Sequence, residues 1–178
     1  MIATDPIAAL NAVPTLQLGY YPTPVEEMSG LRLALGGGPR LFVKRDDTIA
    51  FGFGGNKVRK LELVGARALG EGADTLITAG SVQSNHSRVT AAVAAPHRLR
   101  CLIVANGLRP DKPTANALLY GLFRPYVPYV GSRYERSSAI ASAASRLLPA
   151  GPRPHLLPVR PPTPPPPRPA RWRTSSIV

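Results

Sequence analysis

The chain has 178 residues, 44% of them hydrophobic, which is typical of one globular domain with a sizeable core. Its single cysteine, Cys101, excludes an internal disulfide, and no apolar run approaches the roughly 20 residues that a membrane-spanning helix needs. The N-terminal sequence has no basic segment followed by a long apolar run, so we predict no signal peptide. These features favour a soluble, cytoplasmic protein with no membrane partner.

The net charge of +12 is distributed unevenly along the chain. Residues 1–112 hold 13 Lys and Arg against 9 Asp and Glu, a net of +4, whereas residues 113–178 hold 9 Arg against 1 Glu, a net of +8. The first part is typical of an enzyme surface. In the second part, 11 of the 22 residues from 149 to 170 are proline, which donates no backbone hydrogen bond. We therefore expect residues 151–178 to form a disordered, Pro/Arg-rich tail.

Hydrophobic periodicity predicts a helix from Lys57 to the glycines at 70 and 72, which are stop signals. Its apolar face consists of four residues: Val58, Leu61, Val64 and Leu69. Its opposite, polar face consists of three charged residues: Arg59, Glu62 and Arg67.

Strands and helices alternate through the rest of the sequence. The expected strands cover residues 41–47, 74–80, 99–107, 126–132 and 154–159, and further helices cover 88–95, 114–123 and 135–148. Pro128 indicates that its strand lies at a sheet edge, because proline has no backbone N–H to donate to a neighbouring strand. Alternation with short links predicts an α/β fold with a parallel sheet.

Two polar segments each follow a predicted strand and open a predicted helix: FGGNK at 53–57 and GSVQSNH at 80–86. Ligands gather at the carboxyl ends of parallel strands, so both segments are placed to face one pocket. Lys57 lies at a helix start, where the partial positive charge of the helix disfavours a cation. Lys57 is either a solvated surface group or an amine used in its neutral form, the form that condenses with a carbonyl group.

The second segment brings hydroxyl, amide and imidazole groups together through Gln83, Ser84, Asn85 and His86. Backbone N–H groups at a helix start bind carboxylates or phosphates, but Ser and Asn are also ordinary helix caps. The residues alone leave both interpretations open. His86 has no evident acidic partner, so no Ser–His–Asp triad is predicted, and three scattered histidines predict no metal site.

Four segments together resemble one family: YPTPVEEMSGL (21–31), LFVKRDD (41–47), FGGNKVRKLE (53–62) and GSVQSNHSRVTAAVAA (80–95). The family is that of the pyridoxal-phosphate enzymes D-cysteine desulfhydrase and 1-aminocyclopropane-1-carboxylate (ACC) deaminase. The resemblance covers residues 16–148 and is densest from 41 to 95. It implies the parallel-sheet α/β fold of the tryptophan synthase β-like type, with only the N-terminal half present.

The resemblance implies roles for the polar residues of these segments. Lys57 matches the lysine that bonds to the cofactor aldehyde and later moves the α-proton. Asn85 matches the asparagine that hydrogen-bonds the cofactor's phenolic oxygen, and Asn56 lines the same pocket. Ser84 matches a catalytic serine that holds the substrate carboxylate or assists at the α-carbon, and Gln83 is expected beside the substrate.

The implied cofactor is pyridoxal 5'-phosphate, and the implied reaction is β-elimination from a small amino acid. His86, also expected beside the substrate, stands where desulfhydrases of the family tend to carry His and deaminases Gln. This favours a lyase that converts D-cysteine to pyruvate, ammonia and hydrogen sulfide, with ACC deaminase as the alternative. Relatives are commonly homodimers.

Family members are close to twice as long as this chain, and their second half carries the loop that cradles the cofactor phosphate. We therefore expect a chain truncated or frameshifted after about residue 149, and an inactive or impaired fragment. Residues 1–57 would belong to the larger cofactor domain, residues 58–150 would form the smaller α/β domain, and residues 151–178 the tail.

Two other classes of protein are weaker interpretations. The tail sequence RPPTPPPPRP offers P-x-x-P turns, and with its basic charge it suits an interaction protein. No nucleic-acid-reading motif accompanies it, and aromatic residues make up only 6%, so no nucleic-acid partner is predicted. Nucleotide binding by GFGG is disfavoured because neither dinucleotide nor P-loop spacing is present.

Overall fold

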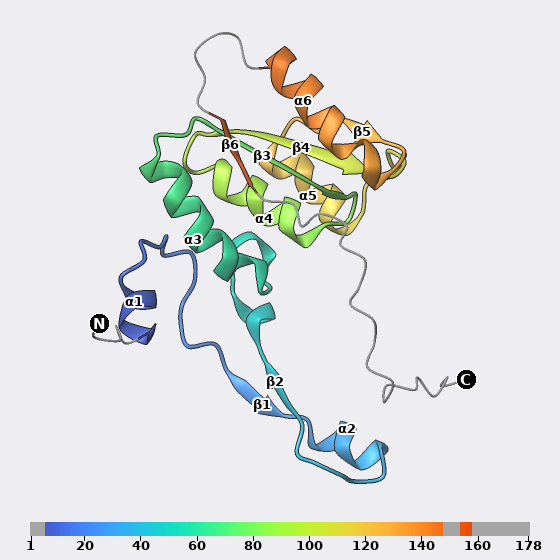
Figure 1. Ribbon diagram of the computed structural model, residues 1–178. Helices are drawn as coiled ribbons and strands as arrows, with labels where there is room; N and C mark the ends of the chain where they lie inside the picture. The colour runs from blue at the N-terminus through green and yellow to red at the C-terminus, as the bar shows by residue number, and fades with distance from the viewer. Residues whose placement is uncertain (1–5, 148–153, 158–178) are drawn as a thin grey trace.

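A four-stranded parallel sheet forms the centre of the computed structural model, which describes residues 6–147 and 154–157 (Figure 1). In the order β5-β4-β3-β6, the strands are Tyr129–Val130, Arg100–Asn106, Thr75–Ser81 and Pro154–Leu156. Strands β3 and β4 pair along their whole lengths. Because they are parallel, the segments that follow them leave the sheet at the same edge.

Helices cover both faces of this sheet (Figure 1). On one face lie α3 Lys57–Gly70, α4 Asn85–Ala94 and α5 Ala115–Phe123, and on the other lies α6 Arg136–Leu147. Successive side chains of a strand point to opposite faces, so Leu76 of β3 joins a core cluster with Val58 and Val89. Its neighbour Ile77 joins a second cluster with Ala143 of α6. The continuous apolar run of β3 is thus explained by burial on both faces.

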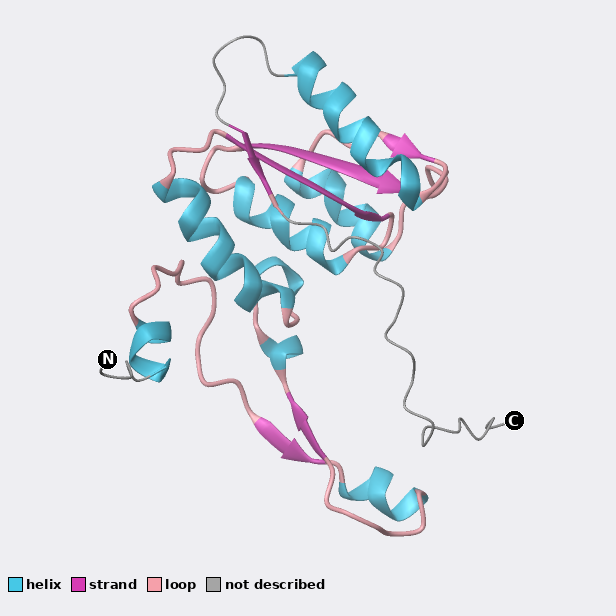
Figure 2. Cartoon of the chain, in the orientation of Figure 1, coloured by secondary structure: helices cyan, strands magenta, loops and turns pink. Residues whose placement is uncertain are grey.

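The N-terminal part of the chain extends from this body as an arm (Figure 2). Helix α1 Pro6–Asn11 comes first. Strands β1 Val25–Glu27 and β2 Phe42–Lys44 then pair antiparallel on either side of helix α2 Ser29–Ala34. Two 3-10 turns, Asp46–Thr48 and Phe51–Phe53, lead from the arm to α3. We define the arm as residues 25–44.

The structure confirms the predicted α/β alternation and changes several element ends. The helix expected over 88–95 begins earlier, at Asn85, because Ser84 caps it. The strand expected over 126–132 is reduced to β5 and one isolated bridge from Tyr126 to Leu102, at the sheet edge that Pro128 indicated. Sequence analysis predicted neither α1, α2 nor β1.

Strand β6 lies inside the range expected to form the tail. It pairs with β3 from Thr75 opposite Pro154 to Ile77 opposite Leu156, and the following Leu157 is fully buried. Residues 154–157 therefore belong to the sheet, as the strand predicted over 154–159 indicated. Residues 158–178 lie outside the described residues, and the division into domains stays a prediction.

Glu62 was expected on the polar face of its helix, and this expectation is wrong because the residue is only 9% exposed. One carboxylate oxygen, Oε1, accepts a hydrogen bond from the backbone N–H of Leu18 at 3.1 Å. The carbonyl of Glu62 accepts another from the N–H of Leu16 at 3.0 Å. The segment before the arm covers this side of α3, which helical periodicity alone does not reveal.

Candidate active site

A glycine turn places Lys57 at the start of α3. Gly54 and Gly55 have φ of +72° and +94°, in the left-handed region that favours glycine. A Cβ on Gly54 would lie 2.6 Å from the carbonyl oxygen of Asp47, so no side chain fits there. The N–H of Gly55 donates to the carbonyl oxygen of Asp46 at 2.7 Å, which holds the turn against the preceding segment.

Lys57 is the first residue of α3, and its side chain is half-buried. Its Nζ donates to Oδ1 of the exposed Asn56 at 3.2 Å. Asn56 precedes the helix but makes no capping hydrogen bond with its side chain. The amide of Asn56 therefore lies beside the lysine amine rather than on the helix backbone.

The turn between β3 and α4 is tightly packed around Ser84. The Oγ of Ser84 accepts a hydrogen bond from the N–H of Ser87 at 3.2 Å, which makes Ser84 the helix cap that sequence analysis left open. A Cβ on Gly80 would lie 2.6 Å from both Cβ and Oγ of Ser84. Glycine at the end of β3 is thus what allows the capping serine to approach the strand.

His86 lies in the first turn of α4 with both ring nitrogens buried and unpaired among the described residues. Burial, followed by the positive charges of Lys60 and Lys57, lowers the pKa of His86 to about 4. The imidazole is therefore neutral at physiological pH.

Gln83 and Asn85 are both held by the start of α5. The Oε1 of Gln83 accepts from the N–H of Asn116 at 2.9 Å, and its Nε2 donates to the carbonyl of Thr114 at 3.2 Å. The Nδ2 of Asn116 donates to Oδ1 of Asn85 at 2.7 Å and to the carbonyl of Gln83 at 2.8 Å. Gln83 thus caps α5. The amide oxygen of the exposed Asn85 accepts from Asn116, and the NH2 group of Asn85 makes no hydrogen bond to Asn116.

Arg88 joins the two segments of the site. Its side chain is 8% exposed, and Nη2 donates to the carbonyl of Gly54 at 2.6 Å, in the turn before Lys57. Its Nη1 donates to Oδ1 of Asn116 at 3.2 Å. Burial lowers the pKa of Arg88, and no carboxylate among the described residues pairs with it. One buried guanidinium therefore spans from the glycine turn to α5.

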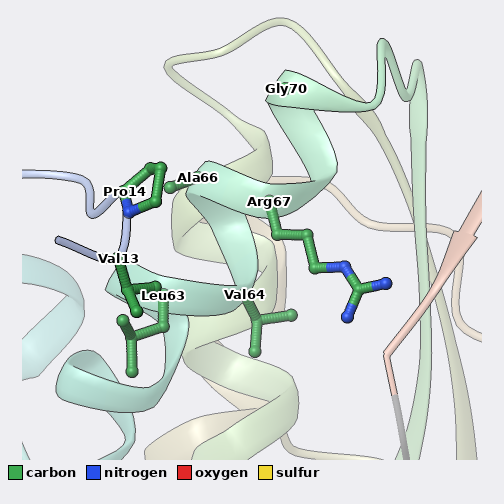
Figure 3. A pocket seen from close by; sticks show the side chains of 7 residues that line it. All are labelled: Val13, Pro14, Leu63, Val64, Ala66, Arg67 and Gly70. Carbon is green, nitrogen blue, oxygen red and sulfur yellow. The ribbon is translucent and has the colours of Figure 1, made fainter. Parts of the chain in front are cut away.

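A separate apolar groove of about 510 Å³ lies along α3 (Figure 3). It is lined by Val13, Pro14, Leu63, Val64, Ala66, Arg67 and Gly70, none of which is a predicted site residue. Its one charged lining residue, Arg67, forms an ion pair with Glu71 at 2.7 Å. The groove therefore adds no reactive group to the site.

A family model described as "Pyridoxal-phosphate dependent enzyme" matches residues 16–159. This chain belongs to the pyridoxal-phosphate dependent enzyme family. The match begins where the resemblance begins and runs through β6, beyond the expected end at residue 148. It confirms the resemblance, the class of cofactor and the parallel-sheet fold class.

Relatives in this pyridoxal-phosphate dependent family include D-cysteine desulfhydrases. That of Klebsiella pneumoniae subsp. pneumoniae is 43% identical over 155 residues, which cover 84% of this chain and 47% of the relative. That of Serratia proteamaculans is 42% identical, with 84% and 46% covered. The chain therefore spans about half the length of the curated relatives it matches.

Solved structures agree with the fold. A structure described as an ACC deaminase homologue has a TM-score of 0.75 and 31% identity, with 85% of this chain and 46% of that chain covered. Diaminopropionate ammonia lyase of Escherichia coli has a TM-score of 0.58 at 19% identity, covering 72% of this chain and 37% of that one, which shows a shared fold alone. In the described parts of the chain, no helix is both long enough and apolar enough to cross a membrane.

The donor set at the two turns fits pyridoxal phosphate in its chemistry. Lys57 offers a primary amine, and the NH2 group of Asn85 is a donor that suits a phenolic oxygen. The buried, unpaired ring nitrogens of His86 are the kind of orphaned polar atoms that mark a functional site. The individual roles of the predicted residues stay predictions.

Sequence analysis missed two residues that hold these groups, Arg88 and Asn116. Arg88 lies inside the expected helix over 88–95 and Asn116 inside the one over 114–123, so neither stood out from its helical pattern. The one available signal was the position of Asn116 in the first turn of a helix, where polar residues normally serve as caps.

Proposed function

We propose that this chain carries the lysine-bearing half of the active site of a pyridoxal-phosphate-dependent lyase of the D-cysteine desulfhydrase type. The observation that carries the proposal is the convergence of two turns: the glycine turn that opens α3 at Lys57, and the β3–α4 turn that ends in the cap Ser84. Arg88 links the same two turns through Gly54. The relatives described as D-cysteine desulfhydrases supply the substrate class.

The proposed reaction converts D-cysteine and water to pyruvate, ammonia and hydrogen sulfide. When bound, pyridoxal phosphate supplies an electron-withdrawing ring that stabilises negative charge at the substrate's α-carbon. Lys57 holds the cofactor and takes the α-proton at Nζ. The amide of Asn85 donates to the phenolic oxygen, and Asn56 lies beside the lysine amine.

Two residues are proposed to recognise the substrate. The Oγ of Ser84 accepts a hydrogen bond from the N–H of Ser87, so its own O–H is left to donate to a substrate carboxylate. His86, neutral because of its low pKa, contributes an uncharged donor and acceptor beside it. Gln83 shapes this turn through its contacts with α5. A cytoplasmic, homodimeric enzyme is part of the same proposal.

The proposal is tested by trapping the cofactor on the full chain. The protein is mixed with pyridoxal phosphate, reduced with borohydride and digested, and the modified lysine is located by mass spectrometry. We expect selective labelling of Lys57 and its loss in Lys57→Ala. Lys60→Ala is the matched control, because Lys60 lies on the same helix and also acts on His86, yet its loss is expected to leave labelling of Lys57 unchanged.

Labelling spread evenly over Lys44, Lys57, Lys60 and Lys112 would overturn the proposal, because it would mean that no pocket selects one amine. Turnover is assayed separately with D-cysteine and with ACC, with hydrogen sulfide and ammonia as the respective products to detect. ACC turnover in excess of D-cysteine turnover would favour the deaminase instead.

A further inference from the structure

A continuous chain of hydrogen bonds runs from Arg88 to Asn85. The Nη1 of Arg88 donates to Oδ1 of Asn116, and Nδ2 of Asn116 donates to Oδ1 of Asn85. A second donation from Nδ2 of Asn116 reaches the backbone carbonyl of Gln83 at 2.8 Å. Asn116 is 9% exposed, so little water is available to replace these partners.

The direction of these hydrogen bonds is determined by two groups that flank Asn116. A guanidinium only donates, so Asn116 must present its oxygen to Arg88. A backbone carbonyl only accepts, so Asn116 must present its NH2 group to Gln83. Both constraints orient the Asn116 amide in the same way, and Asn85 must then turn its oxygen toward Asn116. Its NH2 group is left facing away.

The burial of Arg88 supports a positioning role. Burying a cation without a carboxylate partner is costly, and Arg88 directs Nη1 and Nη2 to the neutral oxygens of Asn116 and Gly54, while its buried Nε has no partner among the described residues. Those two contacts hold the turn before Lys57 and the amide beside Asn85. The guanidinium therefore sets the position of Asn85 relative to the turn before Lys57 without contacting the side chain of either Asn85 or Lys57.

We propose that Arg88 and Asn116 form a relay that fixes the Asn85 amide with its NH2 group available to a bound cofactor. The proposal rests on the proposed function, in which that NH2 group donates to the phenolic oxygen of pyridoxal phosphate. Arg88 and Asn116 are positioning residues, since they act through Asn85 and the glycine turn. The relay itself is present without cofactor and is testable in its absence.

The first experiment measures amide exchange in the cofactor-free chain. The chain holds five asparagines, so selective ¹⁵N-Asn labelling gives five NH2 signals, which Asn85→Ala and Asn116→Ala assign. We expect the hydrogens of the Asn116 NH2 group to exchange with water at least roughly ten times more slowly than those of Asn85. A factor of this size corresponds to the free energy of one hydrogen bond. Equal exchange rates of the two groups in the wild type would overturn the relay.

Asn116→Asp reverses the polarity of the relay with almost no change of shape. The new carboxylate still accepts from Arg88 but cannot donate to Asn85, so the Asn85 amide is expected to turn and donate to it. Exchange of the Asn85 NH2 group then slows. Asn106→Asp is the matched control. Asn106 is the last residue of β4, and its Oδ1 also accepts a hydrogen bond from an arginine, Arg136. Circular dichroism confirms that each variant folds.

The second experiment measures pyridoxal-phosphate affinity by absorbance. We expect Asn116→Asp to weaken binding roughly tenfold to a hundredfold, the effect of losing one hydrogen bond to a charged oxygen. In an Asn85→Ala background the same change is expected to add nothing, because Asn116 acts through Asn85. An equal loss in both backgrounds contradicts the relay. Failure of the wild type to bind at Lys57 contradicts the proposed function instead, and the exchange experiment still decides on the relay.

Discussion

At the scale of single residues, Gly80 and Ser84 show how little space the β3–α4 turn leaves. The serine can cap α4 only because Gly80, the residue before the last of β3, has no side chain. Ser84 is therefore fixed by packing as well as by its hydrogen bond. A serine held in this way keeps its hydroxyl in one place for a ligand.

Gly80→Ala is expected to destabilise the fold by about 1–3 kcal/mol, the usual cost of overpacking. Its Cβ would approach Ser84 and the Oγ of Ser87 to 2.6–2.7 Å. Urea unfolding measures the difference. Gly121→Ala in α5 is the control, since nothing lies within 4 Å of its Cβ, and it is expected to stabilise by about 0.5–1 kcal/mol through helix propensity. Equal effects of the two changes would contradict this account.

His86 should make stability depend on pH. Its pKa is lowered to about 4 in the folded chain from an ordinary 6.5, so the unfolded chain binds the proton first as pH falls. The contribution of the neutral imidazole to the free energy of unfolding is fully present above pH 6.5. It is lost as the pH falls from 6.5 to 4, and the loss is about 3 kcal/mol at most. Urea unfolding across this range should show a shallower decline for His86→Gln, which does not titrate. An unchanged slope would refute the assignment.

At the scale of elements, a polar network attaches the two segments that flank the arm to α3. Arg59 donates to both oxygens of Asp46, at 2.8 and 2.9 Å, and to Oγ1 of Thr23 at 3.0 Å. Its guanidinium also lies 4.5 Å from the ring centre of Tyr21. The hydrogen bonds from Arg59 are the main cause of the lowered pKa of Asp46. The same segment continues into the glycine turn before Lys57.

Arg59→Met is expected to destabilise the chain by about 1–3 kcal/mol, because Asp46 and Thr23 lose a shared donor in a partly buried site. Limited proteolysis should then cut the segment before α3 faster than in the wild type. Arg67→Met is the matched control on the same helix, where an exposed ion pair with Glu71 is worth about 0.5 kcal/mol or less. Equal sensitivity of the two variants would show that the network does not anchor the arm.

Periodicity predicted the elements that are buried on two sides, such as β3 and β4, because a continuous apolar run bounded by turns is typical of a strand covered on both faces. It could not predict β1 or α2, whose residues are all exposed, so that no contrast between a buried and a solvent face sets the sequence pattern. The family motif indicated Lys57 and Asn85, whose roles stay predictions. It could not locate Arg88, because a buried arginine in a helix looks like any exposed one until its partners from other segments are known.

At the scale of the whole molecule, the arm extends away from the body that surrounds the four-stranded sheet (Figure 2). Six of its large apolar residues are exposed: Val25, Met28, Leu31, Leu33, Leu35 and Phe42. Exposed apolar patches of this kind favour association with another surface. Among the described residues, no third strand pairs with the two-stranded sheet of the arm, and open strand edges favour pairing between chains.

We expect the chain to self-associate through the arm at micromolar concentration, as measured by light scattering after size-exclusion chromatography. Leu33→Glu, at a residue that is 81% exposed, should reduce association without changing the melting temperature. Leu122→Glu is the control, at a 67% exposed position on α5, far from the arm. Equal reduction by both changes would point to a general effect of charge on solubility.

The position of β6 at the edge of β3 has a consequence for biosynthesis. Leu157 occupies the main core, and its N–H donates to the carbonyl of Ile77 at 2.9 Å. Almost all of the segment that matches the family model, residues 16–159, must therefore have left the ribosome before β3 can pair with β6. A nascent chain that stalls before residue 154 displays a bare strand edge and a hollow where Leu157 belongs, both of which recruit chaperones and proteases.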